Sequence, residues 1–395
     1  MDTQEVKLAV GDRLTVEIGN VAHGGHFIAR HNGKVIFVRY GITGEKAVIE
    51  ITATSSKVVR ADVVEIIQAS PARVTPPCKY AHPGGCGGCD FQYIDLAFQR
   101  ELKRLVVIEQ FDRLGGLEVD LDVKAVEPAD GLHWRTRMDF AVSNNGHLGL
   151  FSSRSNDVIE IDDCLIAVES MKVSEIATRK WNGKERLELA VSSKGQVNLS
   201  RAGRSISGPT QLNEDVNGIS HTVSAPAFWQ SHLKAPSTLV TEAMALLGLR
   251  EGDIVCDLYG GVGLFAAAMS KRVGAKGKVH LIELDRHATS DAKKAFALAD
   301  NVDVHVGRVE TELRKVGKAD VLLLDPPRTG AGKEVVAQML RLAPRTIVYV
   351  SCDPASLARD AKYLTEAGYS ISHLVGYDLF PMTSHVECVT QFTRD

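Results

Sequence analysis

A regular alternation of apolar runs and helical segments after Pro236 constrains the fold of this chain most strongly. Short runs rich in Val, Ile and Leu lie between the helical stretches, at residues 254–258, 279–282, 302–306, 321–324 and 347–350. This alternation predicts a parallel α/β sheet. Ligands of such sheets bind at the carboxyl ends of the strands, so the residues that end each run are the first candidates for function.

The chain has 395 residues, more than one ordinary core accommodates, and its patterns predict three domains. Residues 1–70 contain short β-branched runs cut by Gly and Asn, which predict a five-stranded OB-like β-barrel; such barrels often bind oligonucleotides, and other small barrels fit equally well. Residues 71–225 are β-rich, apart from an amphipathic helix at 95–114. Residues 226–395 form the α/β domain. Three prolines between 71 and 77 predict a stiff linker, and we expect the barrel and the α/β sheet to have separate cores.

Composition excludes some classes of function. No stretch is apolar and long enough to cross a bilayer, and the chain starts without the pattern of a secretory signal. We therefore expect a cytoplasmic monomer with reduced thiols and no membrane partner. The net charge of −3 gives no overall attraction to nucleic acid. Any affinity for RNA must come from local patches, such as those around Arg135 and Arg137 or Arg201 and Arg204.

Three segments of the α/β region indicate a nucleotide-like ligand. A glycine loop at 257–263 follows the first run, and Glu283 ends the second, where a carboxylate accepts hydrogen bonds from ribose hydroxyls. The loop lacks the G-x-G-x-x-G spacing of dinucleotide sites, which favours S-adenosylmethionine. Asp325 opens an Asp-Pro-Pro-Arg segment at 325–328 and would lie at the mouth of the site. The alternative is that Asp325 caps a helix.

Cys352 follows the fifth run and precedes Pro354, which suits the first turn of a helix. A helix N-terminus favours thiolate over thiol, so Cys352 is a candidate nucleophile. Cys256 and Cys388 lie inside apolar strands and are predicted to be core residues. Glu387, before the last strand, is a candidate general base.

Four further cysteines lie in the first half of the chain, in a Gly- and Pro-rich setting. Four thiolates can hold one zinc ion or one [4Fe-4S] cluster, and their spacing does not distinguish the two. These candidate metal ligands are Cys78, Cys86, Cys89 and Cys164.

Five motifs in order now carry a family resemblance: residues 228–230, 257–263, 325–328, 351–354 and 380–387. Over essentially its whole length the chain resembles the uridine-5-methyltransferases of ribosomal and transfer RNA. The resemblance implies that Cys352 attacks carbon 6 of the base and that Glu387 removes the proton from carbon 5. It also implies a set of contacts to S-adenosylmethionine: Gln230, Tyr259, Gly261, Gly263, Glu283 and Asp325.

The same resemblance implies a TRAM domain at 1–70, a Rossmann-like class I methyltransferase domain at 226–395, and packing of the 95–114 helix on that domain. It favours a [4Fe-4S] cluster over structural zinc, and 23S rRNA over tRNA as the substrate. The chain departs from the family pattern at Gly260, Leu264 and Arg308. Two alternatives remain: an RNA methyltransferase acting on an exocyclic amine, and a non-catalytic RNA-binding iron-sulfur protein.

Overall fold

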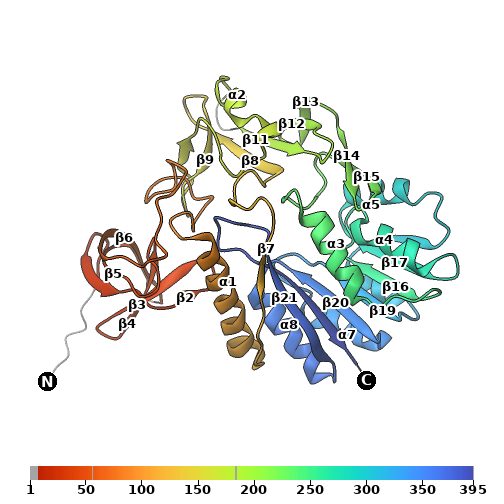
Figure 1. Ribbon diagram of the computed structural model, residues 1–395. Helices are drawn as coiled ribbons and strands as arrows, with labels where there is room; N and C mark the ends of the chain where they lie inside the picture. Colours follow the sequence, from red (N-terminus) through yellow and green to blue (C-terminus); the bar gives the residue numbers. More distant parts are fainter. Residues whose placement is uncertain (1–7, 56, 183–184, 395) are drawn as a thin grey trace.

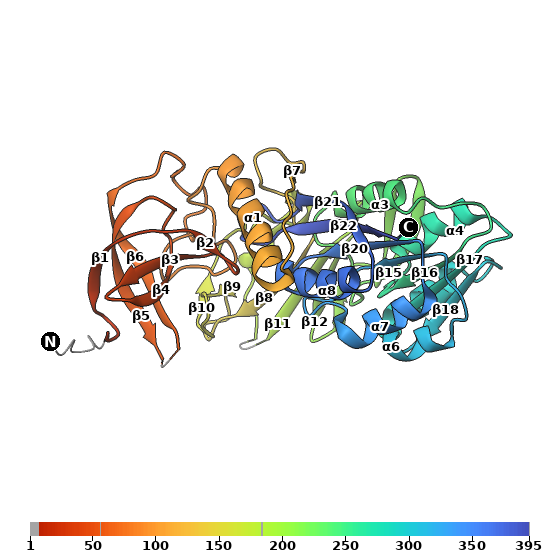
Figure 2. The ribbon, with the colours of Figure 1, turned by 90° about the horizontal axis from the view of Figure 1, so that it is seen from below.

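The computed structural model describes residues 8–55, 57–182 and 185–394. A β-barrel lies at one end and an eight-stranded α/β sheet at the other, with helix α1 (Leu96–Gln110) between them (Figures 1 and 2). A six-stranded antiparallel sheet arches over the junction. Among the described residues, no helix is long and apolar enough to cross a membrane.

The N-terminal sheet closes into a barrel with strand order β1-β5-β6-β4-β3-β2. Closure occurs after β1, where the Gly19 N–H donates to the Ile28 carbonyl at 2.7 Å and the Ile28 N–H donates to the Asn20 carbonyl at 3.0 Å. The sequence pattern predicted five strands and missed the two-residue β2, which is too short to show alternation. The strands are β1 (Arg13–Glu17), β2 (Val21–Ala22), β3 (His26–His31), β4 (Lys34–Arg39), β5 (Lys46–Thr54) and β6 (Val59–Gln68).

The barrel and the α/β sheet have separate cores, as predicted, but the barrel core also includes residues beyond residue 70. Phe91 and the α1 side chains Leu102 and Val106 are buried in the same cluster as the barrel strands. The proline segment is also anchored, because Arg73 donates from Nε to Glu45 Oε1 at 2.6 Å and from Nη2 to Glu45 Oε2 at 2.7 Å. A small barrel buries too little apolar surface alone, and α1 covers its open side.

Helix α1 begins at its cap Asp95, whose carboxylate accepts from the Ala97 and Phe98 N–H groups, and continues into the π-helix Phe111–Gly115. Its second apolar face, with Val107 and Phe111, is buried against the α/β sheet. Helix α1 therefore joins the barrel to the α/β domain, beside a direct contact between His23 Nε2 and Asp353 Oδ2 at 3.1 Å.

The central sheet is antiparallel, with strand order β10-β9-β8-β11-β12-β13. A hairpin of β14 (Gln211–Val216) and β15 (Ile219–Ser224) follows it and packs Val216 and Val223 into the α/β core. Although β7 and this hairpin lie between residues 71 and 225, both join the α/β unit. The other elements are β7 (Val123–Ala125), β8 (Arg137–Val142), β9 (Leu148–Phe151), β10 (Val158–Glu160), η2 (Glu169–Met171), α2 (Val173–Ala177), β11 (Arg186–Val191), β12 (Val197–Arg201) and β13 (Arg204–Ser207).

The C-terminal sheet confirms the predicted parallel α/β fold. Its order is β18-β17-β16-β19-β20-β22-β21-β7, in which β16 to β20 are parallel and β22 is antiparallel to its neighbours. The order reverses between β16 and β19, which opens a crevice at the carboxyl ends of these strands. The strands are β16 (Ile254–Leu258), β17 (Lys278–Glu283), β18 (Val302–Val306), β19 (Val321–Leu324), β20 (Thr346–Ser351), β21 (Ser370–Asp378) and β22 (Glu387–Thr393).

Helices cover both faces of this sheet. Helices α3 (Ala235–Leu246), α4 (Leu264–Val273) and α5 (Arg286–Ala295) bury their apolar sides on one face. On the other face lie α1, α6 (Val309–Glu312), η3 (Leu313–Lys315), α7 (Gly332–Leu342) and α8 (Pro354–Glu366).

Candidate active site

A cleft of about 1270 Å³ opens at the crevice of the α/β sheet, and the central domain forms its other wall. Loops after β16, β17, β19 and β20 contribute its floor. Gly263 is a predicted site residue that does not line the cleft. The predicted residues that do line it are Gln230, Tyr259, Gly261, Glu283, Asp325, Cys352 and Glu387.

Hydrogen bonds to the Glu283 carboxylate fix the glycine loop at the edge of the cleft. Glu283 Oε2 accepts from the Gly261 N–H at 3.0 Å, while Oε1 accepts from the N–H groups of Leu284 and Asp285 at 2.7 Å. Tyr259 and Gly261 have φ values of 61° and 56°, so the backbone turns sharply where a ligand can approach it. The carboxylate is fixed but keeps lone pairs for a ligand.

Gly263 and Gly260 serve packing rather than contact with the cleft. Gly263 has φ 95°, and a Cβ there would lie 2.5 Å from Phe296 Cε2. A Cβ on Gly260 would lie 2.7 Å from Leu281 Cγ, which explains why this chain has no side chain at that position of the motif. Arg308, another departure, lines the cleft and pairs with Glu310.

Asp257 is a buried acid beneath the glycine loop that sequence reasoning did not include among the site residues. Its Oδ2 accepts from the Ala266 N–H at 2.9 Å, and its Oδ1 has no hydrogen-bond partner. Burial, together with the charges of Asp325 and Glu283, raises the pKa of Asp257 to about 8. A carboxylate inside an apolar strand was the signal that could have identified it.

Asp325 directly follows β19 and meets Gln230 across the cleft. The Gln230 Nε2 donates to Asp325 Oδ2 at 3.0 Å, and burial raises the pKa of Asp325 to about 7. The alternative that Asp325 caps a helix is wrong, because α7 begins at Gly332 with Ala331 as its N-cap. The carboxylate is therefore free to face a ligand.

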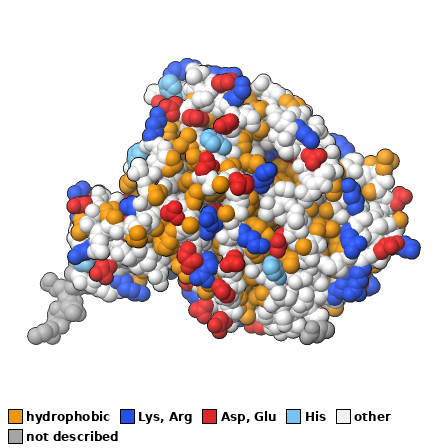
Figure 3. Space-filling view, viewed as in Figure 1, with side chains coloured by type: hydrophobic (Ala, Val, Ile, Leu, Met, Phe, Trp, Pro, Cys, Tyr) orange, Lys and Arg blue, Asp and Glu red, His pale blue; other side chains and the backbone are white. Residues whose placement is uncertain are grey.

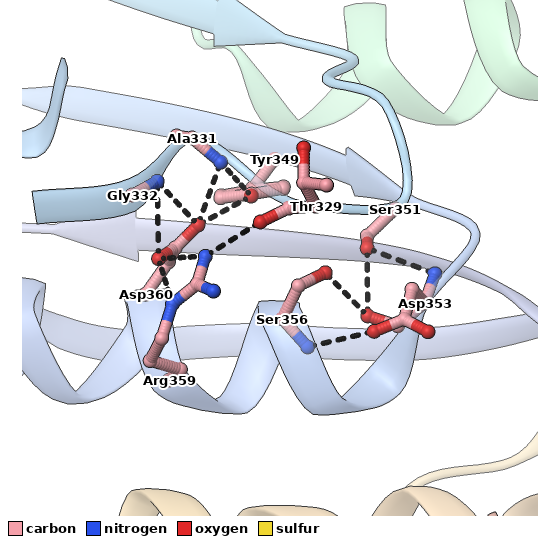
Figure 4. Close-up of polar contacts among 9 residues, drawn as sticks. All are labelled: Thr329, Ala331, Gly332, Tyr349, Ser351, Asp353, Ser356, Arg359 and Asp360. Atoms are coloured by element: carbon pink, nitrogen blue, oxygen red, sulfur yellow. Dashed lines mark hydrogen bonds and ion pairs between the residues drawn. The ribbon is translucent and has the colours of Figure 1, made fainter.

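The loop after Asp325 is anchored from below by α8 (Figure 4). Asp360 Oδ2 accepts from the Ala331 N–H at 2.7 Å and from the Tyr349 hydroxyl at 2.8 Å. Arg359 Nη2 donates to the Thr329 carbonyl at 2.8 Å. These bonds fix the segment between Asp325 and α7, so the cleft wall is preformed.

Cys352 and Glu387 lie at the same edge of the sheet. Ser351 pairs with Cys388 in the register of β20 and β22, and Cys352 and Glu387 occupy the next positions. The Glu387 side chain is buried, and its residue is 3% exposed. Burial and the charge of Asp325 raise the pKa of Glu387 well above its ordinary value. Two acids and a thiol thus share one poorly solvated corner.

The expected thiolate at Cys352 is not supported in the resting protein. Burial, followed by the charges of Glu387 and Asp325, raises the pKa of Cys352 to about 12. The helix end does not compensate, because Asp353 caps α8 by accepting from the Ser356 N–H at 2.8 Å (Figure 4). A carboxylate already occupies the positive end of the helix. Cys352 therefore needs a proton acceptor before it can attack.

The four early cysteines surround a second, smaller cavity of about 120 Å³. The cavity is lined by Cys78, Cys86, Cys89 and Cys164, and all four are free thiols. Lys79 and Asp162 join the two segments that carry them, with Nζ and Oδ2 2.5 Å apart. No three of the four sulfur atoms lie within 4.8 Å of one another.

A set of potential metal ligands that the sequence did not single out lies on β17 and β18. Ligand atoms of His280, Asp303 and His305 all lie within 4.8 Å of one another. Lys278 Nζ is 2.8 Å from Asp303 Oδ1 and already neutralises that carboxylate. None of the three histidine and aspartate residues lines the large cleft.

The sheet order, the glycine loop and the acid that ends the second strand together define the class of the protein: an S-adenosylmethionine-dependent methyltransferase. Family models match in two places. The TRAM domain model covers residues 7–64, and the tRNA (Uracil-5-)-methyltransferase model covers residues 313–395.

Relatives extend the match over the whole chain. An uncharacterized RNA methyltransferase of Streptomyces coelicolor is 40% identical over 424 aligned positions, covering 96% of this chain and 92% of the relative. Another uncharacterized RNA methyltransferase, of Corynebacterium efficiens, is 34% identical, and the alignment covers 98% of this chain and 96% of the relative. This chain therefore belongs to the RNA (uracil-5-)-methyltransferase family, and it is an enzyme. The alternative of a non-catalytic binding protein is set aside.

Among solved structures, the fold is similar to the Pyrococcus abyssi tRNA (uracil-54, C5)-methyltransferase in complex with S-adenosyl-L-homocysteine. The TM-score is 0.73 with 21% sequence identity, over 96% of this chain and 99% of that one. The likeness extends through the barrel, the central sheet and the α/β domain, so the whole arrangement is a shared fold.

Proposed function

We propose that this enzyme methylates carbon 5 of a uridine in structured RNA through a covalent bond between Cys352 and carbon 6. The observation that carries the proposal is the convergence of Cys352, Glu387 and Asp325 in the large cleft, beside the glycine loop. An enzyme that methylates an exocyclic amine needs no such thiol, because the amine itself is the nucleophile.

The order of events follows from the chemistry of uracil. Carbon 5 is a poor nucleophile until the Cys352 sulfur adds to carbon 6 and creates an enolate. The thiol proton passes to a neighbouring carboxylate, and Asp325, with a pKa of about 7, is partly ionised at neutral pH. Once the methyl group has been transferred, with S-adenosylhomocysteine as the leaving group, the Glu387 carboxylate removes the proton from carbon 5. The Cys352 sulfur then leaves and the double bond of the ring re-forms.

The cofactor site fits S-adenosylmethionine, which supplies the methyl group and a positively charged sulfonium. Glu283 would accept hydrogen bonds from the ribose hydroxyls, and Tyr259 and Gly261 would contact the adenosine along the loop. Gln230 and Asp325, joined by their hydrogen bond, would face the charged end of the cofactor. A cation beside Asp325 favours the ionised forms of Asp325 and Glu387, against the burial that raises the pKa of both carboxyl groups.

We also propose that the four early cysteines hold a [4Fe-4S] cluster and not zinc. Four thiolates on one tetrahedral zinc, with Zn–S bonds of about 2.3 Å, lie roughly 3.8 Å apart. The four cysteines around this cavity equally supply a cluster in which each thiolate binds a different iron, and the resemblance to the uridine-5-methyltransferases favours the cluster. The cavity shares Gly88 and Arg135 with the large cleft, but none of the four cysteines lines that cleft, so we assign the cluster a structural role.

We predict that the substrate is 23S rRNA, because the chain carries the TRAM domain and the cluster cysteines. The Pyrococcus abyssi tRNA enzyme shares this fold, so the architecture alone does not distinguish rRNA from tRNA. The test incubates the protein with S-adenosylmethionine and either RNA, transcribed without modifications, and analyses the nucleosides. We expect 5-methyluridine in one of them. Methylated adenosine, guanosine or cytidine in its place would refute the proposal.

A further inference from the structure

The face of the molecule in Figure 3 mixes basic and acidic side chains without one continuous basic surface, in line with the net charge of −3. RNA binding then depends on places where cations are grouped without carboxylate partners. Such a group lies where the barrel meets the central domain.

Two of its members come from neighbouring strands of the barrel. Strands β4 and β6 are parallel, and Val38 and Ala61 point into the barrel core. Arg39 and Arg60 alternate with these residues and are half-buried on the outer face. Arg60 Nε is shielded from solvent and has no hydrogen-bond partner.

The third member, Arg154, comes from the loop between β9 and β10 of the central domain. It is exposed, with φ 55°, and its charge acts on both barrel arginines. Burial and the charges of Arg60 and Arg39 lower the pKa of Arg154. Among the ion pairs of residues 8–55, 57–182 and 185–394, none includes Arg39, Arg60 or Arg154. Asp62, opposite Arg39 in the register, offsets part of this charge.

The arginine group adjoins the large cleft through Gly87. Gly87 lines the cleft, and its N–H donates to the Phe151 carbonyl at 3.0 Å. A Cβ on Gly87 would lie 2.7 Å from the Ser153 N, so the residue before Arg154 touches the cleft wall. Arg135 lines the same wall. A strand leaving the cleft past Gly87 would reach Arg154 first and then the barrel.

We propose that Arg39, Arg60 and Arg154 form a phosphate-binding site for the RNA strand that flanks the target nucleotide. The proposal rests on the proposed function, because it takes the cleft as the place of the target base. One guanidinium group can bind two phosphate oxygens at once. Three guanidinium groups from two domains would therefore hold the RNA strand in place relative to the barrel and to the central domain. An acidic peptide is the other ligand that such a charge group could bind.

The test measures RNA binding without turnover, so that it does not depend on the methylation itself. We expect the Arg39→Ala/Arg60→Ala/Arg154→Ala variant to bind structured RNA at least tenfold more weakly. The slope of log affinity against log salt should fall by about 2, for three lost phosphate contacts at roughly 0.7 each. Arg154→Ala alone, in an exposed loop, should show part of both effects even if the triple variant folds poorly.

Arg13→Ala is the matched control, because Arg13 lies on the same barrel and its Nε is 2.8 Å from Glu50 Oε2. It should leave RNA affinity within about twofold of the unmutated protein. The affinity for S-adenosylmethionine should be equal in all variants. The proposal would be overturned if the triple variant and Arg154→Ala kept the RNA affinity and the salt slope of the unmutated protein. It would also be overturned if poly-glutamate competed for the site as well as RNA does. If the RNA affinities change as predicted but no 5-methyluridine is formed, the result would count against the proposed function and not against the phosphate-binding site.

Discussion

The two cysteine sites of this protein bury thiols in opposite chemical surroundings. In the small cavity, four thiols face one another, and burial raises the pKa of Cys86, of Cys89 and of Cys164, the last to about 11. In the large cleft, the single thiol of Cys352 lies beside two carboxylic acids. Neither site favours free thiolates, so each needs something else to remove the proton.

The two sites differ in what removes the thiol proton: a positively charged metal centre in one, and a neighbouring base in the other. Four thiolates around one cavity are stable when a metal centre neutralises them, and a cavity of about 120 Å³ leaves no room for a substrate. Cys352 opens onto about 1270 Å³ and has acids that can exchange protons with it. Under the proposed function, burial of a thiol has two uses: one site excludes solvent from a metal centre, and the other delays ionisation until the reactants are bound.

The largest effect expected is from Cys352→Ala. Loss of the nucleophile should lower methylation by at least roughly 10³-fold, because no enolate forms, while cofactor binding stays normal. Turnover of 5-methyluridine is the measurement. Cys256→Ala, which removes a buried thiol from the same sheet, is the control and should keep near-normal activity. Near-normal activity of Cys352→Ala would end the covalent account.

Glu387→Gln should separate two steps of the reaction. The thiol still adds and the methyl group still transfers, but the proton on carbon 5 stays, so methylated RNA linked to protein accumulates. Turnover should fall by about 10² to 10⁴-fold, the range for loss of a general base. Denaturing gels with labelled RNA and labelled methyl groups measure the adduct. If turnover stays normal and no adduct forms, another residue is the base.

Changing the small cavity should have a smaller effect on chemistry. Protein purified without oxygen should contain iron and sulfide in equal amounts, and Cys86→Ser should lose most of both. Its melting temperature should fall by several degrees, with partial methylation activity in the folded fraction. Metal analysis and calorimetry check this. Stoichiometric zinc without iron in the unmutated protein would contradict the cluster and leave the large cleft unaffected.

The substitution with the smallest expected effect, Asp325→Asn, tests the acidity of Cys352. Raising its pKa from 9.0 to about 12 should lower its thiolate fraction at pH 7 by roughly 10³-fold relative to a free cysteine. Alkylation by iodoacetamide should therefore be slow at pH 7 and rise about tenfold per pH unit up to pH 10. Asp325→Asn removes one charge that raises the pKa, so alkylation should become severalfold faster. A rate that levels off near pH 8 would show an ionised thiol.

The sequence predicted the α/β strands, the cleft residues and the grouping of four cysteines, because these depend on local periodicity and on the ends of parallel strands. It did not predict the shared core of barrel and α1, since Phe91 and Leu102 carry no sign of which partner they will bury against. The protonated state of Cys352 also escaped prediction. It depends first on burial and then on the charge of Glu387, which lies 35 positions later in the chain and is brought close by the pairing of β20 and β22.

The central claim, covalent attack by Cys352 on the target uridine, is tested most directly with RNA that carries 5-fluorouridine at the methylated position. Fluorine cannot leave as a proton, so the unmutated enzyme should stop after methyl transfer with its sulfur still bonded to carbon 6. Mass spectrometry of the tryptic peptide 346–359 should then show methylated fluorouridine attached to Cys352. An adduct on another residue, or normal release of fluorinated RNA by enzyme that methylates ordinary RNA, would contradict the account.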